Sequence, residues 1–84
     1  MISVKDAVKD ASGFFSEMFP NAQDVRLEEV ELSEEGPWWD ITLSFARPSQ
    51  STFDLMVGQP NRIYKVVRVD GETGEARSVK IRKI

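Results

Sequence analysis

Apolar and polar residues at the start of the chain recur with the period of a helix. The apolar positions, spaced by three and four, form one stripe made of Val4, Ala7, Val8, Ala11, Phe14, Phe15 and Met18. Ser3 directly precedes this stripe, and Asp6 lies three residues after Ser3. This spacing is an acidic variant of the capping box. The residue before Pro20 is pushed out of helical geometry. The pattern predicts a helix over residues 3–18, and we expect Gly13 to let it approach a sheet closely.

The rest of the chain alternates with the period of β-strands. The pattern predicts four strands, over residues 25–32, 38–45, 62–69 and 75–84. The second alternates most cleanly, and its inward positions are Trp39, Ile41, Leu43 and Phe45. Short connections make successive strands neighbours in space. We therefore expect one α+β domain over residues 1–84, with one N-terminal amphipathic helix packed on a four-stranded antiparallel meander sheet.

The first predicted strand contains a break in its alternation. Val25 and Leu27 lie in one phase. Val30 and Leu32 lie in the opposite phase. One extra residue near Glu28-Glu29 would return both pairs to the same face of the sheet. The sequence therefore predicts a β-bulge at this point.

Two connections differ greatly in length. Residues 70–74 contain two glycines and predict a tight hairpin turn with positive φ available. Residues 47–61 are much longer than an ordinary hairpin loop and include the apolar side chains Phe53, Leu55 and Met56. This long connection either caps one end of the core or presents an apolar surface to a partner.

The outward face of the predicted sheet is not fully polar. Trp38 points outward if Trp39 points inward, and Tyr64 and Val66 share the outward phase of their strand. We expect these side chains to form an aromatic patch that binds a partner together with the apolar part of the long connection. Arg68 and Lys80 would border the patch and favour an acidic partner. The alternative is that the long connection folds over the patch and buries it.

Charge is divided unevenly along the chain, whose net charge is −3. Residues 1–40 hold ten acidic and three basic side chains, whereas residues 41–84 hold four acidic and eight basic ones. Such a division indicates either polar interaction surfaces or two halves that neutralise each other in the fold. The acidic cluster, which we expect to be a solvated edge, is Glu28, Glu29, Glu31, Glu34 and Glu35.

Basic side chains of the last two strands could follow a nucleic-acid backbone. The chain as a whole is acidic, and a single tyrosine is the aromatic platform. Charges on an edge strand also prevent aggregation between edges. Weak nucleic-acid binding through these basic C-terminal strands therefore stays only an alternative to protein binding.

The composition removes several classes of chemistry. The chain has neither cysteine nor histidine, so it lacks thiolate metal sites, disulfides and the commonest general base. We expect no catalytic residues, no cofactor and no metal. The N-terminus has no apolar signal region and no apolar run is long enough to span a bilayer, which predicts a cytoplasmic protein with no membrane contact.

The stretch from Tyr64 to Glu75, YKVVRVDGETGE, resembles the end of PepSY-like domains, in which a Tyr-x-Val strand leads into an Asp-x-x-Thr-Gly-Glu turn. The resemblance covers residues 4–79, and its specific part is the turn at 70–75. It implies a non-catalytic binding or inhibitory unit of the kind often attached to peptidases. Those domains are typically exported, whereas this chain carries no export signal, and residues 47–61 look like an insertion. The helix-on-sheet order is also similar to that of cystatins, but their Gln-x-Val-x-Gly motif is missing.

These observations favour a small intracellular protein-binding domain, such as an inhibitor, an immunity-type protein or an adaptor. The alternative is a self-associating module. Its acidic first strand and basic last strand would lie at opposite edges of the sheet, where pairing between copies is electrostatically allowed.

Overall fold

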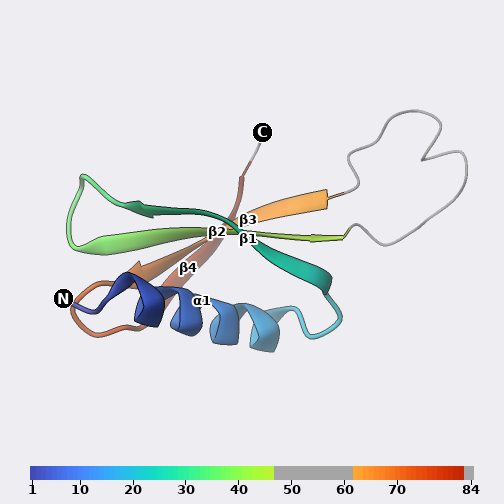
Figure 1. The fold of residues 1–84 in the computed structure, drawn as a ribbon, viewed down its shortest axis with the longest axis horizontal. Coiled ribbons are helices and arrows are strands. Elements are labelled where there is room, and N and C mark those ends of the chain that lie inside the picture. Colours follow the sequence, from blue (N-terminus) through green and yellow to red (C-terminus); the bar gives the residue numbers. More distant parts are fainter. Residues whose placement is uncertain (47–61, 83–84) are drawn as a thin grey trace, which may run out of the picture.

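The computed structural model describes residues 1–46 and 62–82, and these form a helix on an antiparallel sheet. The elements are α1 (Val4–Met18), β1 (Gln23–Leu32), β2 (Trp38–Ala46), β3 (Arg62–Asp70) and β4 (Ala76–Ile81). The strands pair in the order β1-β2-β3-β4. Figure 1 shows α1 lying along one face of the strongly twisted sheet. The predicted α+β meander is confirmed.

The helix begins and packs as its sequence predicts, except at its glycine. The Ser3 hydroxyl accepts a hydrogen bond from the Asp6 N–H at 3.1 Å, which caps the first turn. Ala7 and Ala11 are fully buried, and their small side chains bring α1 close to the sheet. Gly13 is exposed, and a Cβ added there would meet nothing within 4 Å. The expectation that Gly13 permits the close approach is therefore wrong.

The core lies between α1 and the middle of the sheet. Its buried members are Ala7, Ala11, Phe15, Ile41, Leu43, Val67 and Val69. Trp39 and Phe45 are partly buried against this cluster, so all four inward positions predicted for β2 do face the helix. Strand phase in β2 was thus predicted correctly.

The predicted bulge in β1 is present. Leu27 pairs with Leu43 while Glu29 pairs with Thr42, so the register shifts between these positions. This shift returns Val30 to the helix side of the sheet. A second irregularity, which the sequence pattern does not reveal, lies between residues 23 and 26 and includes a positive φ of 53° at Asp24.

The helix does not cover the whole sheet. It packs mainly on β2, β3 and β4. A helix with its side chains is about 10 Å wide, whereas strands are spaced by about 4.8 Å, so one helix spans roughly two to three strands. On β1, Leu27 remains 49% exposed and Leu32 47% exposed. The helix therefore leaves the β1 edge of this face uncovered.

The two hairpin turns at one end of the sheet are tied together. The Gly71 N–H donates to the carbonyl of Pro37 at 2.6 Å, and the Ile2 N–H donates to the carbonyl of Gly71 at 2.7 Å. Of the two glycines in the β3–β4 turn, Gly74 adopts a positive φ of 79°. Gly71 instead permits this close approach, since a Cβ there would lie 2.5 Å from the Pro37 oxygen. The N-terminus lies beside this turn (Figure 1).

The long connection at residues 47–61 lies outside the described residues, and with it the predicted site residues Phe53, Leu55 and Met56. Its suggested roles, capping the core or binding a partner, stay predictions.

Candidate functional site

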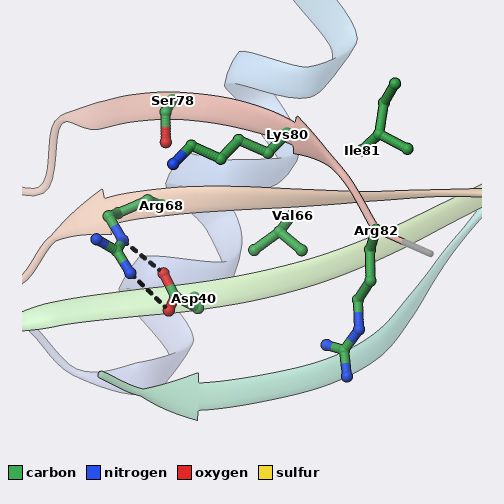
Figure 2. Close-up of a pocket in the computed structure, with 7 residues that line it drawn as sticks. All are labelled: Asp40, Val66, Arg68, Ser78, Lys80, Ile81 and Arg82. Carbon is green, nitrogen blue, oxygen red and sulfur yellow. Dashed lines mark hydrogen bonds and ion pairs between the residues drawn. The ribbon is translucent and has the colours of Figure 1, made fainter. Parts of the chain in front are cut away.

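The sheet face opposite α1, called here the open face, is occupied by arginine–carboxylate pairs. Arg68 binds Asp40 through two hydrogen bonds, Nε to Oδ1 at 2.9 Å and Nη2 to Oδ2 at 3.1 Å (Figure 2). The hydrogen bonds with Asp40 raise the pKa of Arg68 above its ordinary value. The same guanidinium lies 5.9 Å from the ring centroid of Trp38. Trp38 is thus partly covered by a charged neighbour in β3.

A second group of ion pairs lies at the start of β1. Arg62 donates from Nε to the hydroxyl of Ser44 at 2.9 Å and from Nη1 to Asp24 at 2.9 Å. Ser44 in turn donates to Glu28 at 2.6 Å. Hydrogen bonds from Arg26, which have the larger effect, and from Arg62 stabilise the charged carboxylate of Asp24 and lower its pKa. Ser44 is fully buried under these side chains although it lies on the open face.

A third interaction joins the two edge strands. Arg82, directly after β4, reaches across the sheet to the hydroxyl of Thr42 and to a carboxylate oxygen of Glu29, both at 2.8 Å. The hydrogen bond with Glu29 raises the pKa of Arg82. Arg62, Arg68 and Arg82 belong to the basic second half of the chain, and each pairs with a carboxylate of the acidic first half. This agrees with the interpretation that the two halves neutralise each other.

The predicted aromatic patch is not continuous. Trp38 pairs with Asp70, whereas Tyr64 pairs with Ser44. The two aromatic side chains are therefore separated by the length of β2 from position 38 to position 44, about 20 Å at roughly 3.3 Å per residue. The ion pair of Arg68 lies between them. Strand phase placed both residues on the right face, but the register keeps them apart.

Three of the predicted site residues, Val66, Arg68 and Lys80, do meet in one shallow pocket of the open face with a volume of about 310 Å³ (Figure 2). Lys80 is exposed and makes no ion pair among the described residues. Arg68 and Arg82, which also line the pocket, already hold carboxylates. Within residues 1–46 and 62–82, Lys80 is thus the cation of this pocket that an entering acidic group could bind without displacing a carboxylate.

The basic residues of β3 and β4 do not form a continuous strip. Lys65 lies on the helix side, where its Nζ is 5.5 Å from the ring centroid of Phe19. Arg77 binds Asp70 at 3.2 Å on the opposite face. A nucleic-acid backbone would therefore meet cations that are divided between two faces and largely paired with carboxylates, which weakens this alternative.

An apolar concavity lies between α1 and β1, on the face of the sheet that the helix covers only in part. It has a volume of about 430 Å³. We call it the α1–β1 groove, and it is lined by Val4, Lys5, Val8, Lys9, Leu27 and Val30. Its floor and walls are aliphatic, and the two lysines supply the polar groups. The arrangement can bind an apolar side chain or segment.

The sequence pattern alone did not identify this groove. The periodicity of α1 and the bulge in β1 indicate an aliphatic face on each element, but they do not indicate which part of either face stays exposed. Comparing the width of one helix with that of a four-stranded sheet would have shown that part of the aliphatic face stays uncovered, because one helix does not cover four strands. Leu27 and Val30 were thus placed on the correct face, but their exposure depends on where the helix lies.

In residues 1–46 and 62–82, no group of three or more acidic side chains is arranged to hold a metal ion. Within the same ranges, every buried side-chain nitrogen or oxygen has a hydrogen-bond partner. The nearly buried carboxylate of Asp70 accepts from the N–H groups of Glu72 and Thr73, which lowers its pKa and stabilises the turn. No helix in the part of the chain that is described could cross a membrane.

Comparisons of this chain with protein-family models, with curated proteins and with solved structures gave no match.

Proposed function

We propose that this protein is a small non-catalytic protein-binding domain whose docking surface is the α1–β1 groove. The observation that carries the proposal is the exposure of aliphatic side chains of α1 and β1 on the helix side of the sheet. Val4 is 43% exposed, and Leu27 is half exposed although it faces the same side as the core. Exposed apolar surface of this kind, bordered by charged groups, is typical of protein-interaction sites.

The groove is favoured over the open face because of how the two surfaces are composed. Most of the open face carries arginine–carboxylate pairs, which a partner would have to desolvate or displace. The groove presents aliphatic side chains whose removal from water is favourable at about 25 cal/mol per Å². The resemblance to PepSY-like domains agrees with a binding role and stays a prediction.

Affinity capture from the native cell with matched variants tests this proposal. Leu27→Ser and Val4→Ser alter the groove, and Ile81→Ser alters an exposed aliphatic side chain on the opposite edge strand. We expect a partner that the wild-type protein and Ile81→Ser retain, and that both groove variants lose by about tenfold. Equal retention by all of these proteins would refute the groove as the site.

The open face is tested in the same experiment. Trp38→Ala and Tyr64→Ala remove the two aromatic side chains first expected to bind a partner. If these variants lose the partner while Leu27→Ser keeps it, the open face is the docking surface. Circular dichroism of each variant checks that the fold is retained.

A second candidate function, self-association, is favoured by the strand order. β1 and β4 are the two edges of the sheet. β1 carries Glu29 and Glu31 on the open face, so this edge is acidic. β4 carries Lys80 there, which makes no ion pair among the described residues. Sedimentation over a range of protein and salt concentrations tests this candidate. A monomer at all concentrations would exclude it.

A further inference from the structure

The free edge of β1 lies directly beside the α1–β1 groove. Among the described residues, β1 has a strand partner on one side only, which is β2. From Glu29 to Leu32 the pairing with β2 is regular, without a shift of register. The two irregularities of β1 both lie earlier, at residues 23–26 and 27–29. The last part of β1 is therefore a short, regular edge.

The backbone groups that point away from β2 can be identified from the ladder. The Ser33 N–H donates to the carbonyl of Trp38, so the backbone of Ser33 points toward β2. Backbone direction alternates along an antiparallel strand, so Leu32 and Val30 point their N–H and C=O groups away from β2. The edge thus offers two donors and two acceptors to an additional strand.

The side chains along this edge differ between the two faces of the sheet. Val30 and Leu32 face the helix side, and Val30 lines the groove. Glu29 and Glu31 face the open side and are exposed. Glu29 is held by Arg82, whereas Glu31 makes no ion pair among the described residues. A strand placed beside this edge would meet aliphatic neighbours on one face and carboxylates on the other.

We propose that β1 accepts an extended segment of a partner protein, in which aliphatic residues alternate with lysine or arginine. This inference rests on the proposed binding function and names the class of partner. The segment would pair with the backbone of Val30 and Leu32 as a fifth strand. Its aliphatic side chains enter the groove beside Val8 and Leu27, and its basic side chains lie next to Glu31 on the open face.

Charge decides between this segment and other occupants. Antiparallel pairing of β1 with β1 of a second copy would bring Glu29 and Glu31 next to the same glutamates, and like charges directly opposite are destabilising. A helix lying in the groove would leave the outward backbone groups of Val30 and Leu32 without a protein partner. An alternating basic and aliphatic strand satisfies the backbone, the groove and the carboxylates together.

Synthetic peptides provide the test, with the whole protein and nuclear magnetic resonance as the readout. The probe is a peptide of about eight residues, a usual strand length, that alternates lysine and valine and has blocked termini. One control peptide has the same composition with its lysines and valines in two blocks, and another alternates glutamate and valine. We expect the probe to bind at least about tenfold more tightly than either control, and binding to weaken as salt rises.

Amide exchange locates the bound strand. We expect the probe to slow hydrogen exchange at the N–H groups of Val30 and Leu32, because these donors would become hydrogen bonded. Unchanged exchange at both amides would overturn the inference, as would equal binding of the two peptides that contain lysine. The measurement remains informative even if a variant fails to fold, because it uses the wild-type protein.

A pair of variants at one position isolates the backbone contribution. Leu32→Pro removes an outward N–H without removing a hydrogen bond to β2, and proline is tolerated on edge strands in this orientation. Leu32→Ala keeps the N–H and shortens the side chain. We expect Leu32→Pro to weaken probe binding several-fold more than Leu32→Ala does. Equal affinities of the two variants would contradict strand pairing.

Two further outcomes separate this inference from the proposed function. An amphipathic helical peptide that shifts the methyl resonances of Leu27 and Val8, when the alternating probe does not, would overturn the extended segment and leave the groove as a docking surface. Slowed exchange at Val30 and Leu32 that depends on protein concentration without peptide would identify a second copy as the occupant and overturn the partner segment.

Discussion

Replacing Leu43 by alanine removes a side chain from the centre of the core. Leu43 is 1% exposed and lies between α1 and the sheet, where it pairs with Leu27 across the β1–β2 ladder. Leucine-to-alanine changes at fully buried sites cost about 2–5 kcal/mol, because transfer free energy is lost and a cavity remains. A domain of this length has a total stability of roughly 4–13 kcal/mol. Leu43→Ala therefore removes a large part of the stability.

Leu27→Ala is the matched control, because the same atoms are removed from the neighbouring strand on the same face. Leu27 is 49% exposed, so about half of the transfer free energy is at stake and no closed cavity forms. We expect a loss of about 1 kcal/mol. Chemical denaturation followed by tryptophan fluorescence measures both changes, since Trp39 packs against the core.

The comparison of the two variants tests where the helix lies. Equal losses from Leu43→Ala and Leu27→Ala would mean that α1 covers β1 as fully as β2. The α1–β1 groove would then not exist as an open surface, and the proposed function would lose its main support.

Three further substitutions test other features of the fold. Gly13→Ala should raise the free energy of unfolding by about 0.5–1 kcal/mol, because the site is exposed and helical, and a melting experiment that shows no gain would contradict this. Gly71→Ala should lower the stability by about 1–3 kcal/mol, because its Cβ would lie 2.5 Å from the Pro37 oxygen; unchanged denaturation would show that the turns separate without cost. The pKa of Asp70 is lowered from its ordinary value of 3.8 in the folded protein. Its charged carboxylate therefore stabilises the fold at pH values above 3.8, and this stabilisation is lost as the pH falls from 3.8 through the lowered pKa. Asp70→Asn should therefore flatten the acid limb of the stability–pH profile relative to the wild-type protein. A profile identical to that of the wild type would refute the stabilising role of the hydrogen bonds from the N–H groups of Glu72 and Thr73.

Local features of this protein were predictable from the sequence because each depends on neighbouring residues. The capping hydroxyl of Ser3 needs a residue only three positions away. The bulge near Glu28 follows from the phase of four aliphatic residues in one strand. The phase of β2 follows from alternation alone, and Leu43 lies in the core as predicted.

The surfaces of the protein were decided by the tertiary structure. Phase assigned Trp38 and Tyr64 to one face, but only the register of β2 on β3 sets how far apart they lie. The ion pair between Arg82 and Glu29 joins residues at opposite ends of the chain, and no local pattern relates them.

The α1–β1 groove could not be predicted from local sequence patterns either. Periodicity shows that α1 and β1 each have an aliphatic face, and both faces do lie on the same side of the sheet. A single helix is narrower than four strands, so part of the sheet must stay uncovered. Which strand is left open is set by the packing of Ala7, Ala11 and Phe15 onto β2 and β3, and that packing exists only in the folded molecule.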